Sequence, residues 1–250
     1  MSIPPLEPLV RVQGLSRRFG RRRAVEAVSF DIACGEVLGL LGPNGAGKTT
    51  TLHLLAGILA ADSGRVDFAG GLEGNARRGR IGLAPQSLAV YRELSVEDNL
   101  RFFGGLYALR GALLRERVEW VLGWVALASR RGDRVGTLSG GMQRRLNLAC
   151  AAIHLPDLLL LDEPTAGVDA ASRELVLASL QRLCERGTAI VMSTHHAEEA
   201  ARLCDRVAHF EHGRIIAIES ASRPPAASSV AHPRGATLRN ELPSAAPEPE

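Results

Sequence analysis

A glycine-rich segment at residues 42–49 has the residue types and the spacing that bind phosphate groups. It reads Gly42-Pro43-Asn44-Gly45-Ala46-Gly47-Lys48-Thr49 and fits the pattern G-x-x-x-x-G-K-[ST]. Glycines in such a loop let backbone amides curl around phosphate oxygens, and the helix that follows adds the positive end of its dipole. In this pattern Lys48 reaches the β- and γ-phosphates, and Thr49 offers a hydroxyl to Mg²⁺. The segment therefore predicts a nucleotide phosphate site.

Two observations argue against an ordinary glycine-rich turn at this position. Chance gives the pattern in about 2% of chains of this length at average composition. Lys48 is also the only lysine in the chain, because 29 of the 30 lysines and arginines are arginines. A sequence that uses arginine everywhere else has kept one compact, flexible ammonium group where the pattern needs it.

A pair of carboxylates follows the run of four leucines at residues 158–161. Asp162 and Glu163 end this expected buried strand, and from there one carboxylate can hold Mg²⁺ while the other acts on an attacking water. Acidic residues often end strands, so this signal alone leaves both interpretations open. Together with a phosphate loop it predicts a metal ligand and a general base.

A third polar segment precedes an expected helix and reads Leu138-Ser139-Gly140-Gly141-Met142-Gln143. A serine followed by two glycines exposes several backbone amides beside a hydroxyl, which is a second place for an anion at a helix start. An ordinary N-cap with a glycine-rich loop is the alternative, and taken alone the segment favours that alternative.

The composition suits one large α/β domain or two small ones. The chain has 250 residues, of which 46% are hydrophobic, 23% charged and 4% aromatic, a balance typical of globular proteins. The net charge of +3 is too small to favour nucleic-acid binding. No apolar run approaches the roughly 18 to 20 residues of a membrane helix, and the N-terminus does not resemble a secretion signal. The four cysteines have no paired spacing, so we expect neither zinc nor disulfides, and a soluble cytosolic protein.

Short apolar runs alternate with helical periodicity along the chain. The expected strands lie near residues 10–15, 28–32, 37–41, 81–84, 158–161, 189–192, 207–210 and 215–218, and the expected helices near 52–59, 95–107, 114–122 and 176–184. The first two strands form an antiparallel ribbon, and the last two form a hairpin at His212-Gly213. Continuous apolar runs are typical of buried parallel strands, so we expect a mostly parallel sheet covered by helices.

Changes in composition predict the boundaries of the folded unit. We expect a domain at residues 6–220 with a helical subdomain, an insertion in the fold, at about 88–153. Residues 221–250 hold six of the 13 prolines and few large apolar side chains. Such a segment cannot bury enough surface to offset its ordering entropy, which predicts a disordered tail rich in proline and alanine.

In order and spacing, these segments resemble the nucleotide-binding subunit of ATP-binding cassette (ABC) transporters over residues 8–219. The matching motifs are the Walker A segment GPNGAGKTT (42–50), the Q-loop PQ (85–86), the signature LSGGMQRR (138–145), LLLLDEPT (158–165), the D-loop GVD (167–169) and STHH (193–196). Six motifs in register exclude coincidence. The stretches at 28–50 and 204–217 look most like exporter ATPases for drugs, polysaccharides and lipids.

The resemblance implies an α/β P-loop NTPase (RecA-like) core with an antiparallel β-subdomain, and a site for ATP and Mg²⁺. The implied nucleotide-binding residues include Phe19, Gly42, Pro43, Asn44, Gly45, Ala46, Gly47, Lys48, Thr49 and Thr50. Phe19 looks like the family's aromatic residue that stacks on adenine, although a lone phenylalanine more often belongs to a core.

The implied catalytic residues are Lys48, Gln86, Glu163 and His195. Gln86 would contact Mg²⁺ or the attacking water, and Asp162 with Thr49 would hold the metal. Glu163 would be the general base, and His195 would contact the γ-phosphate.

The resemblance also implies two ATP molecules shared between two subunits, with a homodimer expected. Ser139, Gly140 and Gly141 would bind the ATP of the other subunit, and Asp169 would cross the interface to set the two sites in register. The resemblance further implies a second kind of subunit, a separate membrane permease that would dock near residues 88–110. The chain would then lie on the cytoplasmic face of the cell membrane.

The leading hypothesis is therefore a Mg²⁺-dependent ATPase that powers transport, with export favoured over import. One alternative is an ABC ATPase that acts on DNA or ribosomes, but such relatives carry a long coiled-coil insertion or two cassettes. Another alternative is an ATP-binding module without catalysis. The presence of Lys48, Glu163 and His195 argues against it.

A cluster of arginines surrounds Phe19, at positions 17, 18 and 21–23. A solvated basic turn is favoured there over a role in attracting ATP or anionic lipid.

Overall fold

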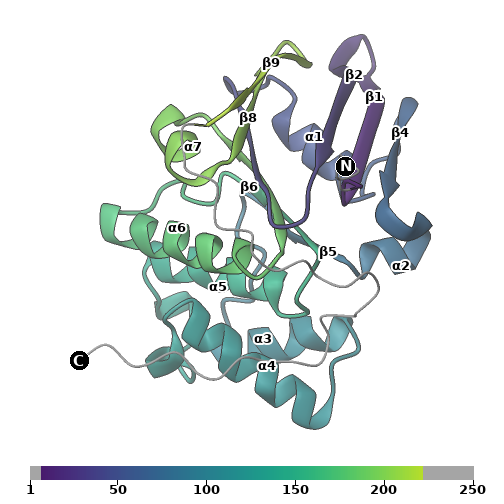
Figure 1. The fold of residues 1–250 in the computed structure, drawn as a ribbon. Coiled ribbons are helices and arrows are strands. Elements are labelled where there is room, and N and C mark those ends of the chain that lie inside the picture. Colours follow the sequence, from purple (N-terminus) through teal and green to yellow (C-terminus); the bar gives the residue numbers. More distant parts are fainter. Residues whose placement is uncertain (1–6, 222–250) are drawn as a thin grey trace, which may run out of the picture.

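The computed structural model describes residues 7–221 of the chain. The predicted tail, apart from Ala221, lies outside the described residues. Two sheets and seven α-helices make up the described part (Figure 1). None of its helices is both long and apolar enough to cross a membrane.

The larger sheet has six strands in the order β5-β6-β7-β3-β8-β9. Their bounds are Ile81–Ala84, Leu158–Asp162, Ala189–Thr194, Val37–Leu41, Arg206–Glu211 and Arg214–Ser220. All neighbours are parallel except the β8–β9 hairpin. His212 and Gly213 turn this hairpin at φ values of 48° and 82°, as a two-residue turn with positive φ requires. The predicted, mostly parallel sheet is confirmed.

The smaller sheet is antiparallel, with the order β2-β1-β4. β1 spans Val10–Phe19, β2 spans Arg22–Ile32 and β4 spans Ser63–Phe68. The β1–β2 ribbon was predicted, whereas β4 was not. β4 is an edge strand with mostly exposed residues, so it lacks the apolar alternation that identifies a half-buried strand.

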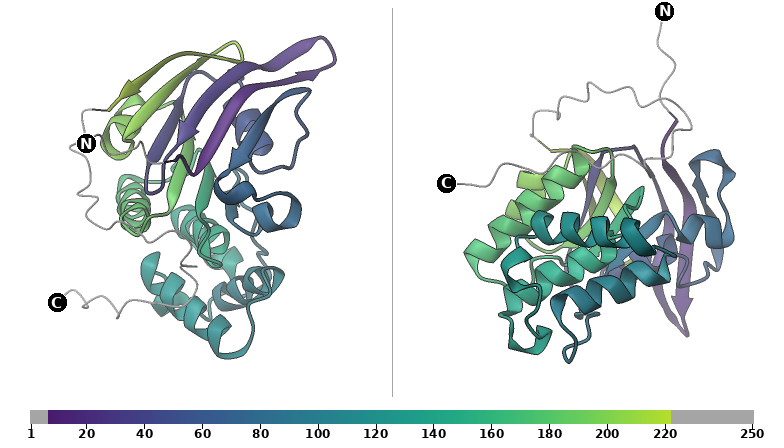
Figure 2. Two further views of the ribbon diagram at one scale, coloured as in Figure 1. Left: turned by 45° about the vertical axis from the view of Figure 1, so that its right-hand side comes forward. Right: turned by 90° about the horizontal axis from the view of Figure 1, so that it is seen from below.

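The helices cover both faces of the larger sheet, as Figures 1 and 2 show. They are α1 (Lys48–Leu55), α2 (Gly74–Arg78), α3 (Val96–Leu106), α4 (Gly111–Trp124), α5 (Gly140–Ala152), α6 (Ala170–Cys184) and α7 (Ala197–Leu203). Helices α3, α4 and α5 lie toward the end of the molecule opposite the smaller sheet. The start of α3 was predicted from Ser95, whose side chain caps it by accepting from the Asp98 amide. The short helices α2 and α7 were not predicted.

The four leucines of β6 pack into two hydrophobic clusters, one on each face of the larger sheet. Leu158 and Leu160 belong to a cluster with β3, α1 and the smaller sheet. Leu159 and Leu161 face the other way, into a cluster with helices α3 to α6. Because successive side chains of a strand point to opposite faces, a strand covered on both sides must be apolar at every position. The same burial fixes where β6 ends, and with it the positions of Asp162 and Glu163.

Candidate nucleotide site

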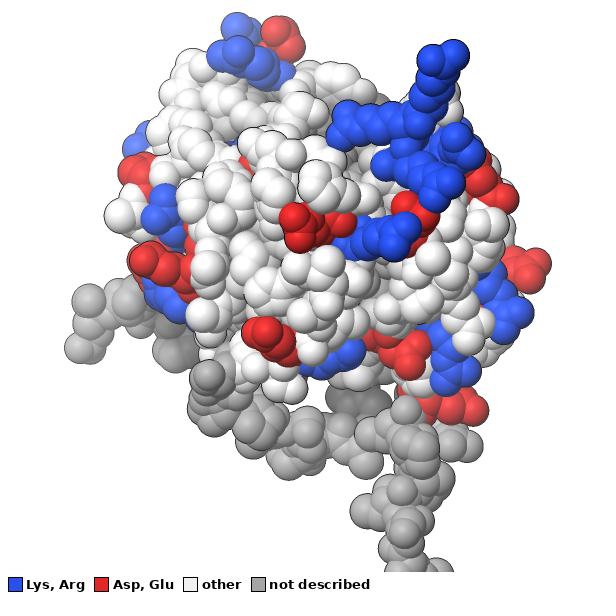
Figure 3. Space-filling view, turned by 90° about the horizontal axis from the view of Figure 1, so that it is seen from above, with Lys and Arg blue, Asp and Glu red and all other residues white. Residues whose placement is uncertain are grey.

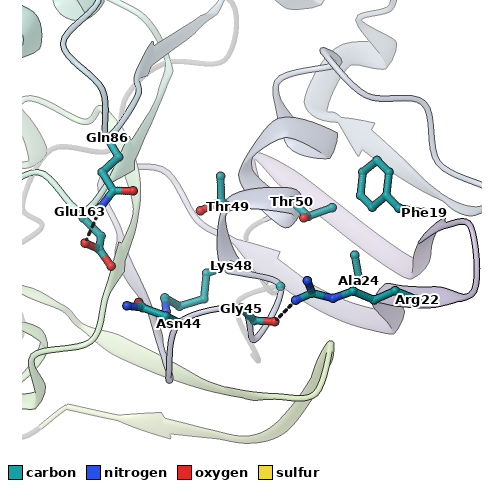
Figure 4. Close-up of a pocket in the computed structure, with 11 residues that line it drawn as sticks. Phe19, Arg22, Ala24, Asn44, Gly45, Lys48, Thr49, Thr50, Gln86 and Glu163 are labelled. Atoms are coloured by element: carbon teal, nitrogen blue, oxygen red, sulfur yellow. Dashed lines mark hydrogen bonds between the residues drawn. The ribbon is translucent and has the colours of Figure 1, made fainter.

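A cavity of about 490 Å³ opens where the end of β1 faces the start of α1. Figure 4 shows that its residues come from β1, β2, α1 and the loops after β3, β5 and β6. The lining residues are Phe19, Arg22, Ala24, Asn44, Gly45, Gly47, Lys48, Thr49, Thr50, Gln86 and Glu163. The structure therefore brings the phosphate loop together with the predicted Phe19, Gln86 and Glu163.

The phosphate loop connects β3 to α1, and its glycines are required by close backbone packing. Gly47 has φ 109°, and a Cβ there would lie 2.3 Å from the Ala24 carbonyl oxygen. A Cβ at Gly42 would lie 2.3 Å from the Phe210 carbonyl oxygen. Neither position admits a side chain. The helix N-terminus that begins at Lys48 thus faces the cavity with its unpaired amides, as an anion-binding helix start does.

Lys48 is folded into this loop and is only 5% exposed. Its Nζ donates to the carbonyl oxygens of Gly42 at 2.6 Å and Pro43 at 3.0 Å. Burial lowers the pKa of Lys48, while the nearby charges of Glu163 and Asp162 act in the opposite direction. A single ammonium group is therefore held at the phosphate loop by backbone carbonyls and faces two carboxylates.

Thr49, which lines the cavity, contacts Asp162 at the end of β6. The Thr49 hydroxyl lies 3.0 Å from each carboxylate oxygen of Asp162. On its other side, Asp162 accepts a 2.5 Å hydrogen bond from the hydroxyl of buried Ser193 on β7. A hydroxyl beside an oriented carboxylate fits Mg²⁺, which takes oxygen ligands from one or two protein groups and keeps several waters.

Glu163 lies directly after β6 and is held between two polar side chains. Gln86 Nε2 donates to one Glu163 oxygen at 3.0 Å, and His195 Nδ1 lies 3.0 Å from the other. The backbone of Glu163 has φ 47°, a strained conformation for a residue with a side chain, and such strain clusters at functional sites. The Ser193 hydroxyl accepts from the Glu163 amide at 3.0 Å. Ser193 therefore contacts the Asp162 carboxylate and the backbone of Glu163.

Phe19 lies across the cavity from Glu163 (Figure 4). It is 48% exposed, so the alternative of a core phenylalanine is wrong. The Arg17 guanidinium lies 5.2 Å from the ring centre. Figure 3 shows basic side chains gathered over the β1–β2 hairpin, to which arginines 17, 18 and 21–23 belong.

Nine of the predicted site residues do not line this cavity. Five of them lie directly behind its wall, in the phosphate loop or in contact with Thr49 or Glu163: Gly42, Pro43, Ala46, Asp162 and His195. The other four belong to the starts of α5 and α6: Ser139, Gly140, Gly141 and Asp169. Ser139 caps α5 and Asp169 caps α6, each by accepting from an amide three residues on. The Ser172 amide lowers the pKa of Asp169 by donating to its carboxylate. A Cβ on Gly141 would lie 2.1 Å from the Ser172 hydroxyl. The two helix starts therefore pack against each other, away from the cavity of their own chain.

A family model described as ABC transporter matches residues 25–166. The chain belongs to the ABC transporter family. It is 38% identical over 213 residues to the linearmycin resistance ATP-binding protein LnrL of Bacillus subtilis, covering 84% of this chain and 68% of that one. It is 42% identical over 214 residues to a Nod factor export ATP-binding protein I of Paraburkholderia xenovorans, covering 84% and 70%. The chain thus spans roughly two thirds of the length of these relatives.

Solved structures of ABC proteins share this fold. One described as the ATP binding subunit of an ABC transporter matches with a TM-score of 0.77 and 29% identity, over 85% of this chain and 90% of that chain. Another is cbiO1 from Clostridium perfringens, described as part of the ABC transporter complex cbiONQ. It matches with a TM-score of 0.78 and 26% identity, over 86% and 89%. The predicted P-loop fold of an ABC cassette is confirmed.

The structure adds two residues to this ABC cassette site that the motifs did not single out. Arg22 Nη2 donates to the Gly45 carbonyl oxygen at 2.9 Å and lines the cavity. Its signal was hidden, because it lies in a run of arginines at 21–23. Ser193 stands in the STHH motif, but only the strand pairing of β6 with β7 shows that it faces Asp162.

Proposed function

We propose that this ABC cassette is the ATP-hydrolysing subunit of a transporter, depends on Mg²⁺ and works as a dimer around two ATP molecules. The observation that carries the proposal is the placement of Glu163. It lies at the edge of a cavity that has the phosphate loop at its base, between the side chains of Gln86 and His195. A general base needs such a geometry first, within hydrogen-bond reach of the water it activates.

The two ends of the cavity suggest how ATP lies in it. Phe19 offers an exposed ring face for adenine, and such stacking is worth about 1 kcal/mol or more. The phosphate chain would then run along the loop toward Lys48, whose ammonium exchanges its two carbonyl partners for phosphate oxygens. Thr49 and Asp162 would hold Mg²⁺, which neutralises charge on the phosphate oxygens when it is bound.

The side chains around Glu163 divide the remaining work. The Glu163 carboxylate accepts a proton from the attacking water, while the Gln86 amide keeps that carboxylate pointed into the cavity. His195 bonds the other oxygen of Glu163 and would pass a hydrogen bond to the γ-phosphate once ATP is in place. Ser193 holds Asp162 and the backbone of Glu163 rigid, so that little reorganisation is needed during the reaction.

The positions of Ser139, Gly141 and Asp169 support a shared site. The start of α5 presents a serine hydroxyl and glycine amides, yet these groups do not line the cavity of their own chain. In the proposed dimer they bind the γ-phosphate of the ATP held by the second subunit, and Asp169 crosses the interface beside them. A homodimer is the simplest arrangement, since one chain carries both half-sites.

A separate membrane permease is the proposed partner, and the region at 88–110 is its proposed docking face. Large apolar side chains are exposed there, among them Leu88, Tyr91, Phe102 and Leu106. They lie close in sequence to Gln86, so a permease could act on the site through this segment. The relatives named for linearmycin resistance and Nod factor export support export as the direction. The chain would then lie on the cytoplasmic face of the membrane.

Phosphate release by the purified full chain with MgATP tests this function. We expect steady release that stops when EDTA removes the metal. A chain that binds ATP tightly but releases no phosphate, even at concentrations that favour dimers, would instead support an ATP-binding module without catalysis. A contaminating ATPase is excluded by running the same preparation of a Lys48→Ala variant.

A further inference from the structure

Arg144 joins three segments of the cassette through one guanidinium group. It lies on α5, five residues after Ser139. Its Nη1 donates to the carbonyl oxygens of Gln86 at 2.7 Å and Pro85 at 3.4 Å, and its Nη2 donates to the Ala166 carbonyl oxygen at 3.4 Å. One side chain thus connects α5 with the loop after β5 and with the turn after β6.

These two backbone segments carry the pair that the proposed chemistry depends on. Gln86 Nε2 donates to Glu163 Oε2 at 3.0 Å. The turn after β6 closes on Glu163 itself, because the Ala166 amide donates to the Glu163 carbonyl oxygen at 3.1 Å. Arg144 therefore holds the backbone on both sides of the Gln86–Glu163 contact.

The charge of Arg144 strengthens this arrangement. Burial lowers the pKa of its guanidinium, while the charges of Asp162 and Glu163 act in the opposite direction, and an arginine stays protonated in any case. A charged donor bonds a carbonyl more strongly than a neutral donor does. Its planar fork also reaches carbonyls in two directions at once, which a lysine cannot do.

The neighbours of Arg144 on α5 have narrower roles. Asn147 donates to the Pro85 carbonyl oxygen at 3.2 Å and accepts from the Ala89 amide at 3.0 Å, so it fixes only the loop after β5. Arg145 donates to the carbonyl oxygens of residues 125 and 126 at the end of α4. Of these three side chains, only that of Arg144 also reaches the turn after Glu163.

We propose that Arg144 is a positioning residue for the hydrolysis described above, and the inference rests on that proposed function. It keeps Gln86 and Glu163 in register and ties them to the start of α5. Ser139 and Gly141 lie at that start, where the ATP of the second subunit would bind. Movement of the α5 start on dimer formation is then transmitted through Arg144 to the turn that follows Glu163.

Enzyme kinetics of three full-chain variants test the role: Arg144→Ala, Arg144→Lys and, as a matched loss of charge on the exposed face of α4, Arg115→Ala. For Arg144→Ala we expect kcat to fall about 10- to 100-fold, because small misplacements of catalytic groups reduce the rate by factors of this order. KM, ATP affinity and melting temperature should stay close to wild type. Arg144→Lys should recover part of kcat, and Arg115→Ala should leave it unchanged. An unchanged kcat in Arg144→Ala would overturn the inference, and so would a parallel loss of ATP binding and thermal stability.

Amide hydrogen exchange of the nucleotide-free chain gives a second measurement that does not require catalysis. In Arg144→Ala we expect the amides of residues 86–90 and 163–168 to exchange faster than in wild type. The amides of residues 146–152 of α5 should exchange at the wild-type rate. In Arg115→Ala, all of these segments should exchange as in wild type. If residues 86–90 and 163–168 exchange at the same rate in Arg144→Ala as in wild type, the role of Arg144 is overturned, even if the wild type hydrolyses ATP. If the wild type releases no phosphate but the exchange difference is present, the proposed function is contradicted, while the role of Arg144 in holding the two backbone segments is supported.

Discussion

The Thr49 hydroxyl lies 3.0 Å from both carboxylate oxygens of Asp162, although the two residues are 113 positions apart. Thr49 is in the first turn of α1, and Asp162 is the last residue of β6. The contact forms because β6 and α1 pack in the same core cluster, with Leu158 and Leu160 on one side and Leu52 and Leu55 on the other. The packing of a leucine run thus decides where a metal could be held.

Asp162→Asn should remove the part of ATP affinity that depends on Mg²⁺. Asparagine keeps the shape and can still accept from Thr49, but it lacks the negative charge that a divalent cation needs. We expect wild type to bind ATP more tightly with Mg²⁺ than with EDTA, and the variant to lose this gain while its affinity in EDTA is unchanged. Equilibrium titration of ATP under both conditions measures the difference. A full Mg²⁺ gain in the variant would contradict the assignment of Asp162 as a metal ligand.

Lys48→Ala should abolish ATP hydrolysis and weaken ATP binding. The variant loses the cation around which the loop is built, and the carbonyl oxygens of Gly42 and Pro43 are left without their partner. Loss of a charge-assisted hydrogen bond costs about 1.5 to 3 kcal/mol, which is roughly a 10- to 150-fold change in an equilibrium constant. Phosphate release and ATP titration measure the two effects. Undiminished turnover in the variant would refute the role given to the only lysine of the chain.

The sequence was most informative where chemistry and local structure are contiguous. The loop at 42–49 and the carboxylates after the leucine run were predicted with their strands, because each is a short segment whose residue types have one common use. Strand β4 and helices α2 and α7 were not predicted. They are short and depend on pairing or packing with distant segments, which single-sequence periodicity does not contain.

Contacts between distant segments could not be predicted from the sequence pattern. Nothing in the run at 144–145 distinguishes the arginine that bonds Gln86 and Ala166 from its neighbour, which bonds the end of α4. That difference comes from the direction of each side chain on α5. The placement of Ser139 and Asp169 away from the cavity was expected only through the family resemblance, because helix-start residues do not show which chain their ligand occupies.

Phe19→Ala should weaken ATP binding through the loss of stacking. Stacking of a base on an aromatic ring contributes about 1 kcal/mol or slightly more, which is roughly a five- to tenfold change in Kd. We expect Phe19→Tyr to stay close to wild type, because the ring face is kept at this exposed position. Binding of ATP and of inorganic triphosphate should be compared, since triphosphate has no base. If both ligands lose affinity equally in Phe19→Ala, the ring does not contact adenine.

Gly141→Ala should displace the α5 start from the α6 start. A Cβ at residue 141 would lie 2.1 Å from the Ser172 hydroxyl and 2.6 Å from its Cβ, closer than any real contact. Overpacking of this kind costs about 1 to 3 kcal/mol, and we expect a lower melting temperature. Ser172→Gly in the same chain should restore part of the loss by removing both clashing atoms. A double variant no more stable than Gly141→Ala would show that the strain lies elsewhere.

Glu163→Gln is the sharpest test of the proposed mechanism, because it separates ATP binding from hydrolysis. Glutamine has nearly the same size but cannot accept the proton of the attacking water. General base catalysis contributes about 10²- to 10⁴-fold, so phosphate release should fall by at least that factor. ATP and Mg²⁺ should still bind, since Lys48, Thr49 and Asp162 are unchanged. Phosphate release and ATP titration on the same preparation measure both effects, and normal hydrolysis in the variant would exclude Glu163 as the base.

The same variant tests whether the site is shared. If ATP stays intact between the phosphate loop of one chain and Ser139 to Gly141 of the other, the dimer should persist. Size-exclusion chromatography with MgATP should then show a dimer that the wild type forms only transiently. Adding Ser139→Arg to Glu163→Gln should abolish that dimer without affecting ATP binding to the monomer, because Ser139 does not line the cavity of its own chain. An inactive variant that stays monomeric at saturating ATP would mean that two isolated copies do not suffice, and that a permease or a different partner chain completes the site.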